Sequence, residues 1–332
     1  MPKSSKSPAP ALIDPRAALI WVAGAIFCAF AHADEYPAKP LRFLIPFPPG
    51  GGADSLARIL GQAAAEKLGQ QIVIDNRAGA GGNIAAEAAA KAAPDGYTLL
   101  QANISHAISA SLYAKLNYDL LKDLVPVTQL ASIPFVLTVH PSLGAGSVTD
   151  LIALAKARPG QFNYASSGNG GPSHLAMEMF KAMAGVNIRH VPYKGAVSAA
   201  ADLIAGQVQM GFFTVAAVLP LVAGGRVKVL GIASTQRSPL VPDVPTIAET
   251  GLPGYAATTW FGVMVPTGTP APIIARLHPV FTQALKLPDV RERLVNQGFE
   301  LIGSTPGEFG AYLRAELKRW RAVVKESRAT VD

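Results

Sequence analysis

Residues 41–54 read LRFLIPFPPGGGAD, a strand-like apolar run that is followed by three glycines and then by an Ala/Leu-rich helical segment. Glycines let main-chain N–H groups converge because no Cβ is in the way. The next helix adds its unpaired first-turn donors and the positive end of its dipole. The stretch therefore predicts a strand, an anion-binding turn and a helix. We expect a β-branched residue at Gly51 to be harmful, because the turn should need glycine conformations.

A second glycine-rich turn, NRAGAGGN at residues 76–83, follows the strand-like run 71–75. Two such turns in tandem suggest a ligand with acidic groups. Neither is a nucleotide motif: Gly52 is followed by Ala53 rather than by the Lys of a phosphate-binding loop, and the G-x-G-x-x-G spacing is not met. The alternative is that both are only tight connections between a strand and a helix.

The first 33 residues have the pattern of an export signal. Lys3, Lys6 and Arg16 precede a short apolar core at 17–30, and small residues flank a cleavage point after Ala33. We therefore expect a periplasmic protein whose mature chain is residues 34–332.

Composition excludes several kinds of site. Cys28 is the only cysteine and lies in the predicted signal, so the mature chain has no disulfide, catalytic thiol or cysteine-ligated metal. Cleavage lowers the formal charge from +7 to +5. The densest basic stretch, 314–325, has helical spacing and includes the acidic residue Glu316. This mixture of charges predicts a solvated helix face rather than a nucleic-acid site. No later segment is apolar for long enough to span a membrane.

The mature chain exceeds the usual size of a single core, which predicts two lobes. Strand-like runs alternate with Ala-rich helical stretches, as in α/β folds with mostly parallel sheets. These runs are residues 41–45, 71–74, 97–100, 162–165, 187–191, 209–213 and 228–232. Helix starts are predicted by S-x-x-D at 147–150 and by Thr305, Pro306 and Glu308. The last helix has an apolar face that predicts core packing: Phe309, Leu313, Leu317, Trp320 and Val324.

Two long apolar strands, 135–140 and 260–265, flank a block with its own alternating pattern. They predict a discontinuous lobe 1 (34–138 plus 260–332) and an inserted lobe 2 (139–259). Two crossing strands make a hinge, and ligands in such folds bind between the lobes at the carboxyl ends of strands.

Lobe 2 supplies its own polar loops, SSGNGGPSH at 166–174 and HVPYKG at 190–195. Hydroxyls and N–H groups are concentrated there at two helix starts. Lys194 could place a cation beside an acidic ligand, or it could be an exposed lysine with no such role.

Six sequence blocks together resemble the Bug family, the extracytoplasmic solute receptors of tripartite tricarboxylate transporters. They are PPGGGAD at 48–54, NRAGAGG at 76–82, PDGYTL at 94–99, YASSG at 164–168, HVPYKG at 190–195 and GQV at 206–208. The resemblance covers essentially the whole mature chain. It implies a type II periplasmic binding-protein fold in which two α/β lobes joined by two crossing strands close around a small carboxylated metabolite.

The resemblance also implies the ligand contacts. In lobe 1 they fall on Phe47, Gly51, Gly52, Ala53, Asp54, Asn103, Ser105 and His106. In lobe 2 they fall on Ser166, Ser167, Gly168, Ser173, Lys194, Phe213 and Thr214. Asp54 and Ser173 have a second interpretation, since each stands near a helix start where it could be a structural cap.

At one position the chain departs from the family pattern. Many members have an acidic residue at the strand end where this chain has Phe213 followed by Thr214. We therefore expect a ligand that lacks an ammonium group and whose apolar body lies against Phe213 or Trp260.

Two other functional classes compete with the receptor interpretation. Ser166 or Ser167, His174 or His190, and Asp202 could form a hydrolase triad, but no G-x-S-x-G elbow accompanies them. The histidines lack metal-ligand spacing, and no cofactor is expected. The receptor could instead present its ligand to a membrane sensor. We expect transporter subunits or such a sensor as partners, no nucleic acid, and a monomer.

Overall fold

The computed structural model describes residues 36–327, and the chain from Lys39 onward forms one compact unit. The predicted signal peptide and its cleavage point lie outside the described residues. No helix within residues 36–327 combines the length and the apolar character that a membrane span requires.

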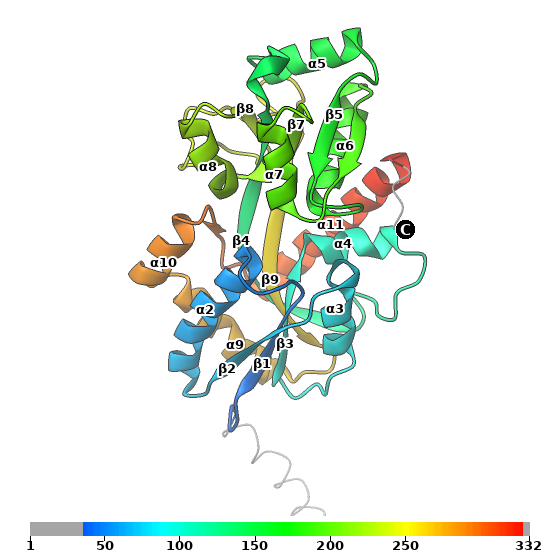
Figure 1. Ribbon diagram of the computed structural model, residues 1–332. Helices are drawn as coiled ribbons and strands as arrows, with labels where there is room; N and C mark the ends of the chain where they lie inside the picture. Colours follow the sequence, from blue (N-terminus) through cyan, green and yellow to red (C-terminus); the bar gives the residue numbers. More distant parts are fainter. Residues whose placement is uncertain (1–35, 328–332) are drawn as a thin grey trace, which may run out of the picture. The chain divides into compact units, whose positions relative to one another are not determined.

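The strands form one mixed sheet in the order β2-β1-β3-β9-β4-β7-β5-β6, with β8 and β10 also paired to β4 (Figure 1). They are β1 (Leu41–Ile45), β2 (Ile72–Asn76), β3 (Thr98–Asn103), β4 (Leu124–Val139), β5 (Asn163–Ser166), β6 (Arg189–Pro192), β7 (Met210–Thr214), β8 (Lys228–Ile232), β9 (Thr258–Pro266) and β10 (Glu300–Leu301). The predicted strands at 41–45 and 228–232 are confirmed residue for residue. The α/β class is confirmed as well.

Parallel pairing occurs in two groups at opposite ends of this order. β1 pairs in parallel with β2 and β3, and β5 pairs in parallel with β6 and β7. β4 and β9 lie between the groups and pair antiparallel to each other. The helices that connect parallel strands must cross over a face of the sheet, so both groups are covered by helices.

β4 is the strand that connects the two groups. Residues 124–134 pair with β9, residues 135–139 pair with β7 on one side, and residues 136–139 pair with β8 on the other. The sequence prediction found only the second part, because Pro126 and Pro134 argue against a strand. The ladder accommodates the region around Pro126 through register shifts at 126–128 and 129–131.

The helices begin and end close to the predicted signals. They are α2 (Gly52–Leu68), α3 (Asn83–Ala90), α4 (Ile104–Leu112), α5 (Val148–Ala157), α6 (Pro172–Ala184), α7 (Ala196–Ile204), α8 (Val215–Ala223), α9 (Ala271–Ala284), α10 (Pro288–Val295) and α11 (Pro306–Ser327). The predicted caps are confirmed: the Ser147 hydroxyl accepts from the Asp150 N–H, and the Thr305 hydroxyl accepts from the Glu308 N–H.

A buried carboxylate ties α11 to β9. Glu316 is 3% exposed, and its Oε2 accepts from the indole N–H groups of Trp260 (2.8 Å) and Trp320 (3.1 Å). Its other oxygen pairs with Arg319, which also donates to the carbonyl of Ala256 just before β9. The last helix is thus fixed to a crossing strand by a charged group that its neighbours neutralise.

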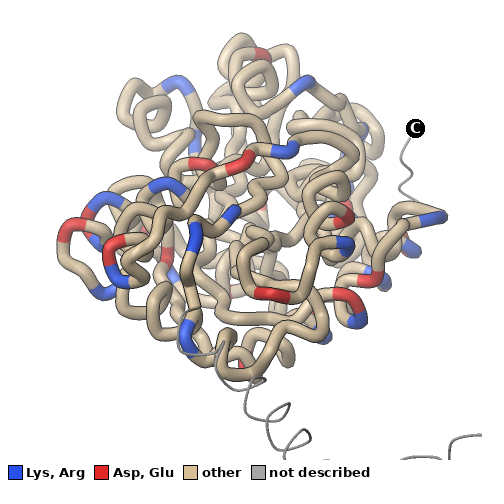
Figure 2. The backbone as a smooth tube through the Cα atoms, turned by 90° about the horizontal axis from the view of Figure 1, so that it is seen from below, with Lys and Arg blue, Asp and Glu red and all other residues tan. Residues whose placement is uncertain are grey.

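This network corrects part of the prediction for residues 314–325, because Glu316 lies in the core rather than on a solvated face. Elsewhere the two signs of charge are mixed: Figure 2 shows Lys and Arg positions interspersed with Asp and Glu positions along the backbone. The predicted apolar face of the helix is confirmed, with Phe309, Leu313 and Trp320 fully buried.

We predict that Glu316→Gln lowers the free energy of unfolding by about 3 kcal/mol, because the amide leaves the Arg319 cation without its buried partner. Urea denaturation measures this change. The matched control is Glu66→Gln on the exposed side of α2, for which we expect a change within about 0.5 kcal/mol. Equal stabilities of the two variants would contradict the proposed anchor.

Candidate functional site

The ends of the parallel strands in the two groups lie close together along β4. Asn103, the last residue of β3, pairs with Phe261 of β9, which pairs with Ala131 of β4. Thr214, the last residue of β7, pairs with Phe135 of β4. Four residues of extended strand span about 13 Å. The carboxyl ends of both groups therefore lie near the middle of β4, which is where α/β folds bind ligands.

The turn after β1 presents backbone donors. Gly51 and Gly52 are exposed, and Gly52 begins α2, whose first N–H groups have no partner within the helix. Ala53 is buried, and its carbonyl accepts from the Gln101 side chain at 2.9 Å. The start of α2 is thus fixed to β3, while its glycine N–H groups remain accessible to an anion.

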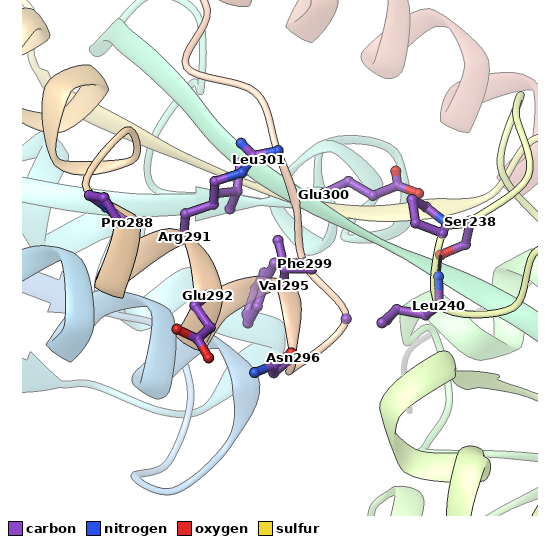
Figure 3. A pocket seen from close by; sticks show the side chains of 12 residues that line it. Ser238, Leu240, Pro288, Arg291, Glu292, Val295, Asn296, Phe299, Glu300 and Leu301 are labelled. Atoms are coloured by element: carbon purple, nitrogen blue, oxygen red, sulfur yellow. Dashed lines mark hydrogen bonds between the residues drawn. The ribbon is translucent and has the colours of Figure 1, made fainter.

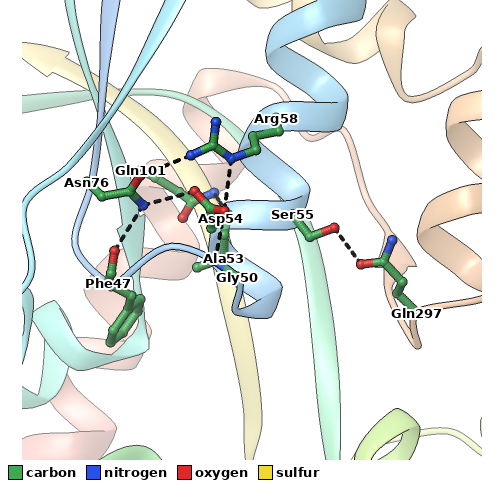
Figure 4. Close-up of polar contacts among 9 residues, drawn as sticks. All are labelled: Phe47, Gly50, Ala53, Asp54, Ser55, Arg58, Asn76, Gln101 and Gln297. Carbon is green, nitrogen blue, oxygen red and sulfur yellow. Dashed lines mark hydrogen bonds and ion pairs between the residues drawn. The ribbon is translucent and has the colours of Figure 1, made fainter.

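The carboxylate of Asp54 is almost fully buried and is engaged inside the protein (Figure 4). It accepts from the N–H of Gly50 (3.0 Å), the side chain of Asn76 (2.9 Å) and the guanidinium of Arg58 (2.9 Å). The hydrogen bond from Arg58 is the largest cause that lowers the pKa of Asp54 to about 2, although burial opposes it. The group is an anion at neutral pH, and its charge is compensated locally.

This arrangement corrects the interpretation of Asp54 as a helix cap. The residue before α2 is Gly51, so Asp54 lies in the first turn of the helix and is not its N-cap. Its oxygens serve the turn: they hold Gly50 and connect to Asn76, whose amide also donates to the carbonyl of Phe47. Asp54 therefore shapes the turn and offers no free carboxylate to a ligand.

The turn after β3 is held by a capping box. The Asn103 side chain accepts from the Ser105 N–H, and His106 Nδ1 accepts from the Asn103 N–H. His106 Nε2 then donates to the carbonyl of Gly82, at 3.2 Å. Burial lowers the pKa of His106 to about 4, which keeps the ring neutral. Ser105 and His106 are buried, so in this conformation they support the loops from behind.

The second group of strands carries the loop 166–171, which we call the serine loop. The Ser166 hydroxyl is 1% exposed; it accepts from the Gly168 N–H and lies 2.6 Å from His190 Nε2. The Ser173 hydroxyl accepts from the Ser167 N–H, and the two hydroxyl oxygens are 3.0 Å apart. Ser173 lies inside α6, whose N-cap is Gly171, so it is not the cap.

Lys194 lies next to the serine loop. The N–H groups of Tyr193 and Gly195 donate to the carbonyls of Ser166 and Ser167. Lys194 stands between them and is exposed. The backbone contacts therefore fix the position from which this cation extends.

The aromatic contacts expected for an apolar ligand body lie in the core. The ring of Phe213 is 3% exposed and packs with Val136 and Leu203, and Trp260 is fully buried against α11. Neither ring offers surface to a ligand in this conformation, because both sit on strands whose faces are covered. Thr214 is half-buried at the start of α8.

One histidine does touch a serine, a contact that no sequence pattern predicted. His190 contacts Ser166, but the Asp202 carboxylate accepts from the Tyr193 hydroxyl at 2.7 Å. The serine is buried, and it is engaged with its own loop. The geometry is that of a supported loop rather than of the predicted alternative, a triad with an accessible nucleophile.

A separate cavity of about 620 Å³ lies between the segment at Ser238 and the region from α10 to β10 (Figure 3). Its walls include the apolar side chains of Leu240 and Phe299 and the charged side chains of Arg291 and Glu300. Phe299 also lies 3.7 Å from the position that a Cβ on Gly52 would take. The cavity is therefore close to the start of α2.

Sequence reasoning missed the residues that hold the loops from behind. Asn76 and Arg58 support the first turn, and His190 supports the serine loop. Asn76 is the register partner of Ile45, the last residue of β1. Recognising that these two strands are parallel neighbours would have placed Asn76 beside the turn.

The crossing strands and the facing strand ends define a class, the type II periplasmic binding proteins, as predicted. Residues 56–328 match the family described as the tripartite tricarboxylate transporter family receptor. The chain belongs to this family, which is a family of receptors and not of enzymes.

Similar proteins cover nearly the whole chain. Protein BugT of Bordetella pertussis is 41% identical over 312 residues, which is 93% of this chain and 96% of that protein. The structure described as R. palustris Rpa4515 with adipate is 36% identical with a TM-score of 0.78, covering 89% of this chain and 99% of that one. MatC from Rhodopseudomonas palustris with bound malate is 33% identical with a TM-score of 0.76, covering 87% and 100%. The resemblance to the Bug family is confirmed.

The expectation that Gly51 needs a glycine conformation is wrong, and the requirement falls on its neighbour. Gly50 has a φ of +89°, whereas Gly51 is extended, with φ −86°, ψ 174° and open space where a Cβ would lie. We predict that Gly50→Ala lowers the free energy of unfolding by about 1–2 kcal/mol, the cost of a left-handed conformation. The matched variant Gly51→Ala should change it by no more than about 0.5 kcal/mol. Urea denaturation of both variants tests this, and a larger loss at Gly51 would contradict it.

Proposed function

We propose that this chain is an exported solute receptor that captures a small carboxylate between two lobes and delivers it to the membrane subunits of a tripartite tricarboxylate-type transporter. In this proposal the mature chain starts after Ala33 and works in the periplasm. Lobe 1 is residues 34–138 with 260–332, and lobe 2 is residues 139–259.

One observation carries the proposal: the loops at the carboxyl ends of the two strand groups lie near the same few residues of β4. Residues 131–135 separate the strand that precedes α4 from the strand that precedes α8. A ligand held by the turn after β1 is therefore within reach of loops from the other group when the lobes close.

The chemistry of the loops favours an anion. The exposed glycines of the first turn offer N–H groups, the serine loop offers a hydroxyl at Ser167, and Lys194 offers a positive charge. The only acidic side chain of the turn after β1 is Asp54, whose charge is compensated by Arg58 and which also accepts a hydrogen bond from Asn76. An ammonium group on the ligand would have no carboxylate in these loops to pair with. Relatives described with adipate and with malate support a carboxylate ligand.

The proposed hinge lies where β4 and β9 pass between the lobes. The loop after α10 also contacts helices of both lobes. The Ser55 hydroxyl of α2 donates to Gln297 at 2.7 Å, and the adjacent Gly298 approaches Ala216 of α8. Gly298 has a φ of +88°, and a Cβ on it would lie 3.6 Å from Ala216, in ordinary van der Waals contact. Closure about β4 and β9 would therefore move α8 against this loop.

The proposal predicts that mature protein, residues 34–332, is stabilised by a small carboxylate. At about 100 times its dissociation constant a ligand adds roughly 2.7 kcal/mol, which raises the unfolding midpoint by several degrees. The panel should contain adipate, malate, other mono-, di- and tricarboxylates, and amides. The protein should first be unfolded and refolded, because this treatment removes any carried-over ligand.

Aspartate and glutamate belong in the same panel as discriminating probes. They have the carboxylates but add an ammonium group, so we expect a smaller shift than with the matched acid that lacks it. Tight binding of either amino acid would contradict the ligand class. No shift with any acid in refolded protein would contradict the receptor proposal itself.

We predict that Lys194→Gln weakens carboxylate binding about tenfold, the loss expected when a hydrogen bond to a charged group is removed. The thermal midpoint without ligand should not move, because the side chain is exposed. Isothermal titration calorimetry with the acid selected by the panel measures the effect. Lys156→Gln, on the exposed side of α5, is the matched control. Equal affinities of the two variants would remove Lys194 from the site.

A further inference from the structure

Three aromatic rings are stacked behind the serine loop. The rings of His174 and His190 have centroids 3.9 Å apart and planes within 6° of each other. Tyr164 lies beside these two rings, with a centroid distance of 4.8 Å and an interplanar angle of 20° to His190 and a centroid distance of 6.3 Å to His174. The rings come from β5, β6 and α6. We call this group the ring stack.

The two histidines hold opposite ends of the serine loop. His190 Nε2 lies 2.6 Å from the Ser166 hydroxyl at the start of the loop. The Gly170 N–H near its end donates to His174 Nδ1 at 2.9 Å. Two glycines of the loop have positive φ values: Gly168, which lies between the two contacts, at +143°, and Gly170, which makes the second contact, at +66°. The backbone of the loop thus has an unusual conformation that two imidazoles constrain.

The hydrogen bond from Gly170 requires an unprotonated Nδ1 on His174. A proton on that nitrogen would set two N–H donors against each other and would place a cation 3.9 Å from the neighbouring imidazole. Burial lowers the pKa of His174, and burial lowers the pKa of His190 to about 3 with a further contribution from His174. Both rings are therefore neutral at neutral pH.

The charged groups around the stack are themselves paired. Glu178 lies 3.9 Å from His174 Nε2 and accepts from the Tyr164 hydroxyl at 2.5 Å and from Lys181 at 2.6 Å. Glu178 and Lys181 are on α6, as His174 is, and Tyr164 is on β5. Lys181 opposes a positive charge on either ring, while Glu178 favours one on His174. The Gly170 N–H points at His174 Nδ1, so protonation of His174 would break the hydrogen bond that holds this end of the loop.

We propose that His174 and His190 are positioning residues for ligand binding, which hold the serine loop in its binding shape only while both rings are neutral. The inference rests on the proposed function, because it assigns the serine loop to the ligand. It goes beyond that function by making affinity depend on a proton bound behind the loop, on groups that do not touch the ligand.

Two pairs of substitutions separate the hydrogen bonds from the packing. His174→Asn places an amide oxygen where Nδ1 accepts, and His190→Gln places an amide where Nε2 meets Ser166, so both keep a polar partner that does not titrate. His174→Phe and His190→Phe keep a flat ring in the stack but remove the polar atom. Circular dichroism and the thermal midpoint establish that each variant is folded.

At pH 7.5 we expect the Phe variants to bind the selected acid about tenfold more weakly than wild type, which is the loss of one hydrogen bond. The Asn and Gln variants should retain affinity within about threefold, since the bond is preserved. If folded Phe variants bind as tightly as wild type, the histidines do not position the loop and the inference is overturned.

The pH dependence of the affinity is a measurement that a loss of packing alone would not change. The affinity of wild type, divided by that of His174→Asn at the same pH, should be constant above about pH 6.5 and should fall at lower pH once His174 takes up a proton, because burial lowers its pKa. Protonation of the ligand cancels in this ratio. A ratio that stays constant down to the lowest pH at which both proteins remain folded would overturn the inference.

A measurement without ligand distinguishes this inference from the proposed function. In an NMR titration of ligand-free protein, the Gly170 amide should shift as the pH falls from 7.5 to 4 in wild type and should not shift in His174→Asn. If no acid binds but this titration is seen, the proposed function fails, and only the proton-dependent hydrogen bond between His174 and the serine loop is supported. If acids bind and the amide does not titrate, the inference fails alone.

Discussion

The pairing of β4 along its full length is the constraint on which the arrangement of the site depends. Its first part belongs to the ladder with β9, and its last five residues belong to the ladders with β7 and β8. Because a hydrogen-bonded ladder fixes register to one residue, it also fixes how far apart the ends of β3 and β7 lie. The loops that follow these strands are brought near each other for the same reason. The buried Glu316, bonded to both Trp260 and Trp320, anchors the partner strand β9 to the last helix.

Charge compensation leaves the backbone donors of the turn after β1 available to an anion. A carboxylate placed among amide N–H groups would repel an anionic ligand, and Asp54 occupies that position. Its negative charge is matched by Arg58, one helical turn along α2, and its remaining bonds go to Gly50 and Asn76. The turn is thereby shaped by an acid and still presents donors outward. The same principle operates on the other side of the site, where imidazoles hold the serine loop from behind and need to be neutral to do so.

Much of the fold was predictable from local patterns. The strand at 41–45, the glycine turn after it, and the helices capped by Ser147 and Thr305 all depend on residues close together in the chain. The long strand β4 was predicted only in part, because Pro126 is accommodated near register shifts that depend on its neighbour β9. The conformational demand was assigned to Gly51 and belongs to Gly50, since three successive glycines look alike in sequence.

The sequence by itself determined the α/β class, the family, and the loops at which a ligand would be expected. These features follow from the periodicity of apolar residues, from the positions of glycines and from short sequence blocks in a fixed order. Only the tertiary structure decided which members of those loops face outward and which are supports. Asp54, His106, Ser166 and Phe213 are polar or aromatic residues in the expected places, yet each is engaged or packed inside the protein. Their partners Asn76, Gly82 and His190, and the core around Phe213, come from other elements. Such contacts depend on strand register and helix packing, which no local pattern specifies.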